Sequence, residues 1–405
     1  MARSSHPPPT RRSAPPSGRA EHGPGVSGRC DNRRMPDSVR SARFARQIAL
    51  PGFGLEGQER LGAARVLVIG AGGLGSTVIP TLAGAGVGTI GIIDDDRVET
   101  SNLHRQLVHG TADVGRAKVD SAADRVAAIA PDAVVVRHTE RLSADNALHL
   151  FADYDLVLDG SDNFPTRYLA NDAAALSDLP LVWGAVSQYG GQVGVAWASR
   201  GPQYRDLFPT PPPPGSVLSC AVGGVLPTTV GVVGSLMASE AIKIITGLGD
   251  PLVGRVTVFD GLAGTFRELA YAEDPEAEPV TGLIDYDAFC GVVADDSASA
   301  DDADADTLSA DDLAGLLPDV TLIDVREPWE AEIAAITGSV LLPLGELPER
   351  IGEIDDSRPV VLYCHHGIRS ASALRILRDA GVAARHLDGG IDAWSRAVDP
   401  TIVRY

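Results

Sequence analysis

The chain has 405 residues, a formal net charge of −20 and an apolar fraction of 44%. This length suits two or three domains, and the composition is that of an ordinary globular chain. The excess of acid argues against a nucleic-acid partner, which would require basic surface. The four cysteines lie far apart, which argues against a disulfide framework and favours a reducing cytoplasm. No apolar run reaches the length that spans a bilayer, so no membrane association is expected.

Changes in composition divide the chain into segments. Residues 1–36 are rich in Pro, Ser, Gly and Arg and lack the apolar segment of a secretory signal, so we predict a disordered tail. Residues 292–306 consist largely of Asp, Ala and Ser, which is typical of an acidic linker. The sequence therefore predicts one domain over residues 37–291 and a smaller one over residues 307–405.

Strand-like and helix-like patterns alternate through the larger segment. Apolar runs predict strands, and longer periodic stretches predict helices; the strands are expected at 65–70, 88–94, 133–136, 156–159 and 181–184, and the helices at 74–86, 118–130 and 231–246. This alternation predicts an α/β fold, a Rossmann-like doubly wound sheet with helices on both faces. A proline-rich stretch at 201–224 interrupts the pattern, and long irregular connections of this kind are often functional.

A glycine-rich turn joins the first predicted strand to the helix that follows. Gly70, Gly72, Gly73 and Gly75 permit a tight turn in which backbone amides approach a phosphate at the helix N-terminus. Asp94 ends the next strand, where an acid caps a ribose hydroxyl in dinucleotide-binding folds. This pattern alone indicates a nucleotide, and by itself it favours NAD over ATP.

Polar residues after the second strand change that balance. Asn102, Arg105, Lys118 and Asp162 follow in order. Asp162 comes just after the strand predicted at 156–159, at its carboxyl end, where a carboxylate can hold Mg²⁺. Each residue alone has a structural explanation, such as a surface ion pair or a helix cap. Together they favour a site for a triphosphate and its metal, which an NAD enzyme does not need.

The segment from about residue 41 to residue 291 resembles the MoeB/ThiF-type adenylyltransferases, the bacterial relatives of ubiquitin-activating enzymes. The matching strings are RFARQ at 43–47, GAGGLG at 70–75, DDDRVETSNLHRQ at 94–106, VGRAKV at 114–119, LVLDGSDN at 156–163 and EAIKIITG at 240–247. The resemblance implies that ATP and Mg²⁺ are held by eight residues: Gly73, Asp94, Ser101, Asn102, Arg105, Lys118, Asp162 (the metal ligand) and Asn163. It also implies a homodimer in which Arg46 reaches the active site of the neighbouring subunit, with Arg46 and Arg105 acting in catalysis.

The family resemblance also implies a reaction and a partner. Such enzymes transfer AMP from ATP to the C-terminal glycine of a small ubiquitin-like sulfur-carrier protein that ends in Gly-Gly. A carboxylate is a poor acyl donor, and adenylylation gives it a good leaving group. The protein has to position the two reactants and neutralise pyrophosphate charge, which suits the residue types above.

The chain departs from this family at two metal-binding motifs. Many members carry two CxxC pairs that bind structural zinc, and here the corresponding positions are Gln203–Asp206 and residues 277–280, with no cysteine in either. We therefore expect no zinc. Cys220 follows the proline run at the position of the family's mobile-loop cysteine, which implies a covalent role toward the carrier. Cys290 is expected to be a packing residue.

The smaller segment carries a cysteine loop between a strand and a helix. Cys364 ends the strand predicted at 360–364, and the loop to Arg369 and Ser370 opens a helix predicted at 370–380. Backbone amides, the helix N-terminus and Arg369 are expected to stabilise a thiolate or a persulfide anion. Phosphatases use a related loop that is usually longer, so the loop length favours sulfur over phosphate.

This segment resembles a rhodanese domain, a small α/β fold. The matching strings are LIDVREP at 322–328, AITGSVLLP at 335–343 and HLDGGIDAW at 386–394. The resemblance implies that Cys364 takes sulfur as a persulfide from a donor, either a cysteine desulfurase or thiosulfate. Fusion to the first domain raises the local concentration of the persulfide near the adenylate. Transfer of the persulfide sulfur to the adenylate would convert the carrier to a thiocarboxylate.

Three other functions stay open on the sequence. An NAD-dependent oxidoreductase needs only the glycine turn and Asp94, whereas activation of a ubiquitin-like protein without sulfur transfer needs only the first domain. A scaffold with an inactive rhodanese would leave Cys364 without a role. The carrier and its pathway are not defined, and molybdopterin synthesis is favoured over thiamine, cysteine or tRNA thiolation by the family resemblance alone.

Overall fold

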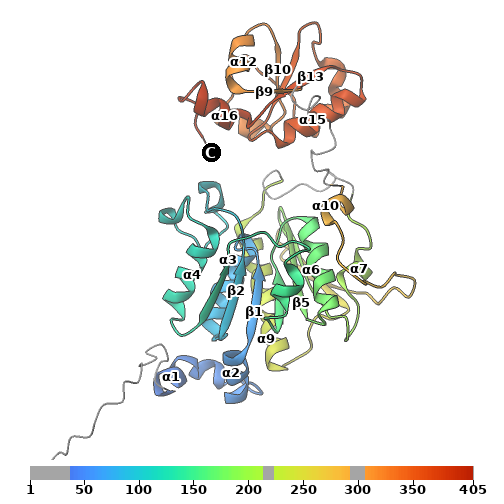
Figure 1. Cartoon of the computed structure of the whole chain (residues 1–405). Coiled ribbons are helices and arrows are strands. Elements are labelled where there is room, and N and C mark those ends of the chain that lie inside the picture. Colours follow the sequence, from blue (N-terminus) through green and yellow to red (C-terminus); the bar gives the residue numbers. More distant parts are fainter. Residues whose placement is uncertain (1–36, 213–222, 292–305, 405) are drawn as a thin grey trace, which may run out of the picture.

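The protein is described here by a computed structural model that covers residues 37–212, 223–291 and 306–404. These residues build two separate sheets, one of eight strands and one of five (Figure 1). The tail predicted at 1–36 and almost all of the linker predicted at 292–306 lie outside the described residues. So does Cys220.

The larger sheet has the strand order β3-β2-β1-β4-β5-β6-β7-β8. The first five strands in the chain are parallel, and the last three add to one side as antiparallel neighbours. Their bounds are β1 Arg65–Ile69, β2 Thr89–Ile93, β3 Val134–His138, β4 Leu156–Asp159, β5 Leu181–Ser187, β6 Gly190–Ala196, β7 Arg255–Asp260 and β8 Thr265–Ala270. The five predicted strands are confirmed, and the antiparallel extension was not predicted.

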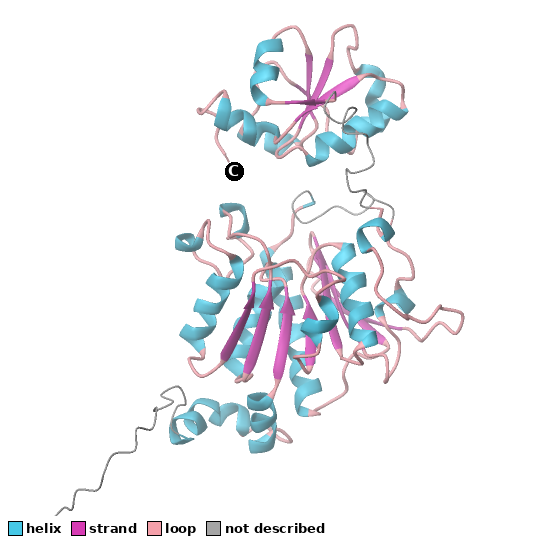
Figure 2. Ribbon diagram, viewed as in Figure 1, coloured by secondary structure: helices cyan, strands magenta, loops and turns pink. Residues whose placement is uncertain are grey.

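Helices cover both faces of this sheet, as Figure 2 shows. The helical elements of this domain are α1 Asp37–Ile48, α2 Gly54–Ala63, α3 Gly73–Ala85, α4 Lys118–Ile129, α5 Ala147–Phe151, α6 Phe164–Leu176, α7 Tyr204–Leu207, α9 Pro227–Thr246 and α10 Tyr286–Phe289, with short 3₁₀ turns η1 Thr100–Asn102 and η2 Thr111–Asp113. Alternation along β1 explains the two layers. Val66 and Val68 join a core with α3 and α9, whereas Leu67 and Ile69 join a second core with α5 and α6.

Helix α9 is long and apolar enough to cross a membrane by length and composition alone. In the structure it packs on α3 and the sheet, with Val233, Met237 and Ala241 fully buried. Its buried Glu240 pairs with Lys243 at 2.6 Å and accepts a hydrogen bond from the backbone amide of Leu252 at 2.9 Å. Helix α9 is therefore a core helix that packs against the sheet. These three apolar residues are buried in the protein, and its one buried carboxylate is paired with protein groups.

The smaller sheet is entirely parallel, with the order β11-β10-β12-β13-β9. Its elements are β9 Thr307–Leu308, α12 Ala310–Leu316, β10 Thr321–Asp324, α13 Pro328–Ile333, β11 Val340–Leu341, α14 Leu347–Arg350, η4 Ile351–Glu353, β12 Val360–Tyr363, α15 Ile368–Asp379, β13 Ala384–Leu387 and α16 Gly390–Ala397. Helices again lie on both faces, so the predicted combination of a Rossmann-like domain and a small α/β domain is confirmed.

A buried ionic cluster ties three distant segments together in the larger domain. Asp172 on α6 accepts two hydrogen bonds from Arg205 on α7, both at 2.7 Å, and one from the hydroxyl of Tyr286 on α10, also at 2.7 Å. The guanidinium lies over the rings of Tyr168 and Phe289, with its central carbon 5.0 and 4.8 Å from the ring centroids. Asp172 is 2% exposed, so these partners take the place of the water molecules that an exposed carboxylate would bind.

Replacing Asp172 by Ala is predicted to destabilise the domain by about 3 kcal/mol, because it leaves Arg205 partly buried without its counter-charge. Chemical denaturation followed by tryptophan fluorescence measures the change. Asp145→Ala removes an exposed carboxylate and serves as the matched control. Equal stability of the two variants would contradict the assignment.

Candidate functional site

A cavity of about 1610 Å³ opens at the carboxyl ends of the parallel strands. It lies where β1 is flanked by β2 on one side and β4 on the other, the point at which the strand order reverses direction. Open α/β sheets bind their ligands at this point. Residues that line the cavity include Gly73, Asp94, Arg105, Lys118 and Asp162.

The glycine turn between β1 and α3 admits no larger residue at two positions. Gly70 has a φ of +86°, in the left-handed region, and a Cβ on Gly75 would lie 2.0 Å from the carbonyl oxygen of Gly70. Gly72 is the N-cap of α3 and offers no side chain to the first amides of the helix. These amides are therefore available to an anion in the cavity.

Two side chains fix the peptide groups of Ala71 in this turn. The Ala71 amide donates to Asp94 Oδ2 at 2.7 Å, and the Ala71 carbonyl lies 3.0 Å from His109 Nε2. Since a carbonyl only accepts, Nε2 carries the proton, and Nδ1 accepts from the Ser121 hydroxyl at 2.9 Å. Burial lowers the pKa of His109, so the imidazole is neutral. No motif in the sequence marked His109.

Asp94 is itself occupied by backbone donors. Its second oxygen, Oδ1, accepts from the amide of Asp96 at 2.9 Å. Burial raises the pKa of Asp94, although Lys118 and the amides act in the opposite direction. The structure therefore gives Asp94 a role that the sequence did not predict, which is to hold the glycine turn against the end of β2.

Lys118 begins α4 and extends into the cavity. Its side chain is 8% exposed, and Nζ forms an ion pair of 2.7 Å with Asp96 Oδ2. Asp94, Asp95 and Asp96 have carboxylate oxygens within 4.8 Å of one another, so the ammonium sits beside an acidic cluster. The same ammonium can neutralise a phosphate that enters the cavity.

Ser101, Asn102 and Arg105 lie on one segment but have different positions relative to the cavity. Arg105 lines the cavity, whereas Ser101 and Asn102 are not among the lining residues. The Asn102 side chain accepts from the Glu99 amide at 3.2 Å and is buried within the η1 turn, and the Ser101 carbonyl accepts from Arg105 Nη1 at 3.1 Å. These two residues shape the turn that places Arg105, rather than facing the cavity.

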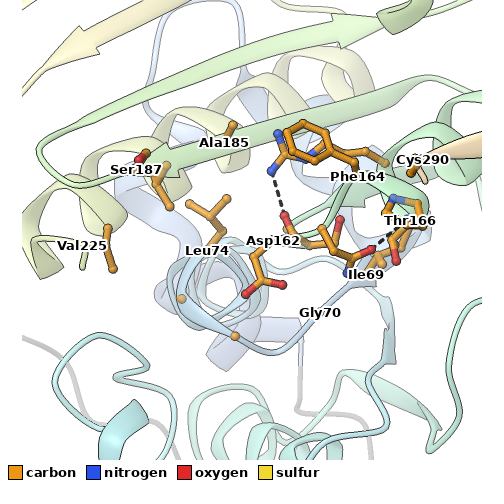
Figure 3. A pocket seen from close by; sticks show the side chains of 18 of the residues that line it. Ile69, Gly70, Leu74, Asp162, Phe164, Thr166, Ala185, Ser187, Val225 and Cys290 are labelled. Carbon is orange, nitrogen blue, oxygen red and sulfur yellow. Dashed lines mark hydrogen bonds between the residues drawn. The ribbon is translucent and has the colours of Figure 1, made fainter. Parts of the chain in front are cut away.

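The end of β4 supplies the other wall. Asp162 is exposed to the cavity beside the glycine turn, as Figure 3 shows. Asn163 is the N-cap of α6, where its Oδ1 accepts from the Thr166 amide at 2.9 Å. Arg167 reaches back from α6 to the Ser161 carbonyl at 3.0 Å and lines the cavity. The sequence did not single out Arg167, because its spacing on a helix is that of any exposed cation.

Arg46 and the cysteines of the larger domain lie in different places. Arg46 is exposed on α1, at the opposite end of the sheet from the cavity (Figure 1). It therefore does not reach the cavity of its own chain. Cys290 is buried at the cavity edge, and burial raises the pKa of its thiol to about 11, which suits a packing role.

The smaller domain places Cys364 at the end of β12, where the chain turns into α15. Its Sγ accepts from the Gly367 amide at 3.1 Å. The Ser370 hydroxyl lies 3.6 Å from the sulfur, but its single hydrogen has a nearer acceptor in the Gly367 carbonyl at 2.9 Å. Gly367 has a φ of +96°, and a Cβ on Gly390 would lie 2.4 Å from the carbonyl oxygens of Cys364 and His365. Both glycines are thus needed to form a loop whose donors point at the sulfur.

Arg369 forms an ion pair with a carboxylate of α13. Its two terminal nitrogens donate to the two oxygens of Glu330, both at 2.6 Å, and the side chains are 12% and 4% exposed. Much of the charge expected to act on the sulfur is therefore compensated. His365 is neutral as well, because burial and the neighbouring His366 lower its pKa to about 4. The nearest hydrogen-bond donor to Cys364 Sγ in the described part of the chain is the neutral Gly367 amide.

The Glu330–Arg369 pair predicts a pH-dependent stability. Burial opposes the charge of Glu330, yet Arg369 and the Glu327 amide lower its pKa below 4.5. The stability that the Glu330–Arg369 pair adds is fully present above pH 4.5, the ordinary pKa of the carboxyl group. It is lost as the pH falls through the lower pKa of Glu330 in the folded state.

Glu330→Gln is predicted to destabilise the smaller domain by about 2 kcal/mol at neutral pH, because the buried charge of Arg369 loses the carboxylate that compensates it. Calorimetric unfolding at about pH 7 and about pH 4 measures the difference, which is expected to shrink at the lower pH. The exposed Glu332→Gln is the control. An unchanged unfolding temperature at neutral pH would refute the assignment.

Comparisons with known proteins assign both halves of the chain. Residues 44–280 match the ThiF family, and residues 309–397 match the rhodanese-like domain. The chain is 49% identical over 374 residues to the probable adenylyltransferase/sulfurtransferase MoeZ of Mycobacterium tuberculosis, covering 90% of this chain and 95% of that protein. It is 39% identical to the adenylyltransferase and sulfurtransferase MOCS3 of Drosophila yakuba, covering 90% and 85% of the two chains.

Two further comparisons cover the larger domain. A sulfur carrier protein adenylyltransferase of Thermus thermophilus is 50% identical over 262 residues, which are 62% of this chain and 96% of that protein. Among solved structures, Escherichia coli MccB bound to MccA-N7isoASN matches with a TM-score of 0.54 at 20% identity, covering 60% and 75% of the two chains, which shows a shared fold. The chain therefore belongs to the ThiF family and carries a rhodanese-like domain after the ThiF region.

Proposed function

We propose that this enzyme adenylylates the C-terminal glycine of a small ubiquitin-like sulfur-carrier protein and converts it to a thiocarboxylate. The observation that carries the proposal is the convergence of Arg105, Lys118 and Asp162 on one cavity beside the glycine turn. A nicotinamide cofactor would need neither two cations nor an exposed carboxylate at that place.

The residues present fit ATP and Mg²⁺. Gly75 leaves no room for a Cβ beside the Gly70 carbonyl, so the turn is as tight as a phosphate-binding turn requires. The amides that begin α3 have no capping side chain. The buried Gln106 Oε1 beside the turn has no hydrogen-bond partner among the described residues. ATP supplies an electrophilic α-phosphorus and pyrophosphate as leaving group. Asp162 would hold Mg²⁺ through carboxylate oxygen. Lys118 and Arg105 would neutralise phosphate oxygens, with Lys118 exchanging its contact to Asp96.

The first reaction joins two substrates within the cavity. A carboxylate oxygen of the carrier attacks the α-phosphorus, the bond to pyrophosphate breaks, and an acyl-adenylate remains. The glycine turn and the two cations orient the phosphates and compensate their charge. The cavity volume of about 1610 Å³ exceeds that of a typical small-ligand site, which leaves room for a nucleotide and an extended peptide tail.

The second reaction uses Cys364. A donor leaves a sulfur atom on its Sγ, and the terminal sulfur of that persulfide attacks the acyl carbon while AMP leaves. A thiolate then attacks the cysteine sulfur, so that a disulfide forms and the thiocarboxylate departs. The amide of Gly367 would stabilise sulfur anions in these steps, and the Ser370 hydroxyl would join it by turning from the Gly367 carbonyl to the sulfur. Cys220, outside the described residues, is the candidate thiol.

The lining of the cavity supports delivery between the two sites. Residues of the smaller domain, including Arg369, Ser372 and Arg375 of α15, line the same cavity as the glycine turn. Cys364 itself is buried and does not line the cavity, but α15 begins at the Cys364 loop, which places the sulfur site next to the cavity wall. The sulfur donor, a cysteine desulfurase or thiosulfate, is not distinguished by these features.

A homodimer forms part of the proposal. Arg46 lies at the wrong end of its own sheet to reach the cavity, so a catalytic role for it requires a neighbouring subunit. Leu262, Phe266 and Leu269, around the edge strand β8, are 73%, 55% and 56% exposed. An exposed apolar edge of this kind is usually covered by another chain. A reducing cytoplasm suits the free thiols of Cys290 and Cys364.

Zinc does not fit the residues at the family's metal motif. Among the described residues, Gln203 and Asp206 stand at the first motif, and no cysteine is present at either. Asp206 Oδ1 accepts from the amide of Asp274 at 3.0 Å, while Oδ2 accepts from the amide of Gln203 at 2.6 Å. This one carboxylate joins the two segments that a zinc ion would join.

Chelation is therefore predicted to leave the folded domain unchanged. Incubation with EDTA should not lower the unfolding temperature, and elemental analysis of the purified chain should find no stoichiometric zinc. Asp206→Ala should lower the unfolding temperature by several degrees, because it removes two hydrogen bonds. Stoichiometric zinc, or unfolding on chelation, would contradict this part of the proposal.

Exchange of labelled pyrophosphate into ATP tests the first reaction. Exchange is predicted to depend on a carrier that ends in Gly-Gly, and Asp162→Asn should slow it by about 100-fold, because the metal loses a charged ligand. Cys364→Ser should leave exchange intact and abolish thiocarboxylate formation, measured as oxygen-to-sulfur exchange in the intact mass of the carrier. Asp145→Asn is the control. Absence of exchange with every Gly-Gly carrier would refute the proposal.

A further inference from the structure

His104 lies next to Arg105 on the loop that follows η1. Arg105 Nη1 is 2.9 Å from His104 Nε2 and 3.1 Å from the Ser101 carbonyl. A guanidinium only donates, so Nε2 is the acceptor and the imidazole is neutral with its proton on Nδ1. The two hydrogens of Nη1 are therefore both used, one on each acceptor.

This arrangement fixes the direction of the guanidinium. The group has five N–H donors in a rigid plane, and the two anchored hydrogens leave Nη2 and Nε with three. Arg105 lines the cavity, and in the described part of the chain no residue accepts a hydrogen bond from those three donors. The two hydrogen bonds of Nη1 thus fix the plane of the guanidinium, and Nη2 and Nε can donate to a phosphate that lies in this plane.

We infer that His104 is a positioning residue that orients Arg105 toward the triphosphate, and that its protonation releases Arg105. This inference rests on the proposed function, because Arg105 has a substrate only if ATP binds in the cavity. An imidazolium cannot accept at Nε2, and it repels the adjacent guanidinium. The anchor is therefore present only when His104 is neutral.

The surroundings of His104 set the sign of the pH effect. Partial burial, followed by the charge of Arg105, lowers the pKa of His104 below 6.5, and Arg105 is the one charged group among the described residues that acts on it appreciably. Arg105 is consequently anchored at neutral pH and is released as the pH falls through that lowered value. The His104 side chain is exposed, so a substitution at this position should not disturb folding.

Two variants separate orientation from packing. In His104→Gln, the amide oxygen can accept from Arg105 at any pH, whereas in His104→Leu nothing can accept. Carrier-dependent pyrophosphate exchange is measured from about pH 5.5 to about pH 8, the range in which histidine titrates. His149→Leu, which removes an exposed imidazole from α5, is the control.

The wild type should lose activity on the acid side of this range, and His104→Gln should flatten that loss. His104→Leu should lower kcat/KM for ATP by about 10-fold at neutral pH, as expected for loss of one charge-assisted hydrogen bond. If both variants keep the wild-type pH profile and kcat/KM, the inference is overturned while the proposed function stands. If the wild type shows no exchange, the proposed function fails first.

Discussion

The glycine turn after β1 is the constraint on which the larger site depends. Gly70 adopts a left-handed conformation, and Gly75 brings α3 so close to the strand that no side chain fits between them. Asp94 and His109 then hold the amide and the carbonyl of Ala71 from opposite sides. With the backbone fixed in this way, the first amides of α3 point into the cavity before any ligand arrives, which lowers the reorganisation required for binding.

The two sites use the same physical device for different anions. In each, a buried parallel strand ends in a glycine-containing turn that leads into a helix, and amide donors face the space above the strand. The larger site adds Lys118 and Arg105, as a triphosphate with several charges requires. The smaller site pairs Arg369 with Glu330, so Cys364 is surrounded by dipoles more than by net charge. A single sulfur anion needs less compensation than a triphosphate does.

The sequence predicted the parallel strands and their helices well, because buried strands are continuous apolar runs and glycines mark the turns. It did not predict β6, β7 and β8, whose residues are less apolar and whose pairing depends on long-range contacts. Arg105, Lys118 and Asp162 were predicted in the cavity and line it, since together they form a pattern of polar residues after the glycine turn. Asn102 turned out to be a buried turn residue. His109 and Arg167 were missed because their roles depend on contacts with backbone carbonyls, which leave no sequence pattern.

The central claim is that Lys118 and Asp162 share one triphosphate and its metal. A crystal structure with a non-hydrolysable ATP analogue and Mg²⁺ tests it most directly. We expect phosphates against the N-terminus of α3, Lys118 Nζ turned from Asp96 to a phosphate oxygen, and the metal beside Asp162. A nucleotide bound elsewhere, or one that leaves Lys118 on Asp96 and Asp162 without metal, would contradict it.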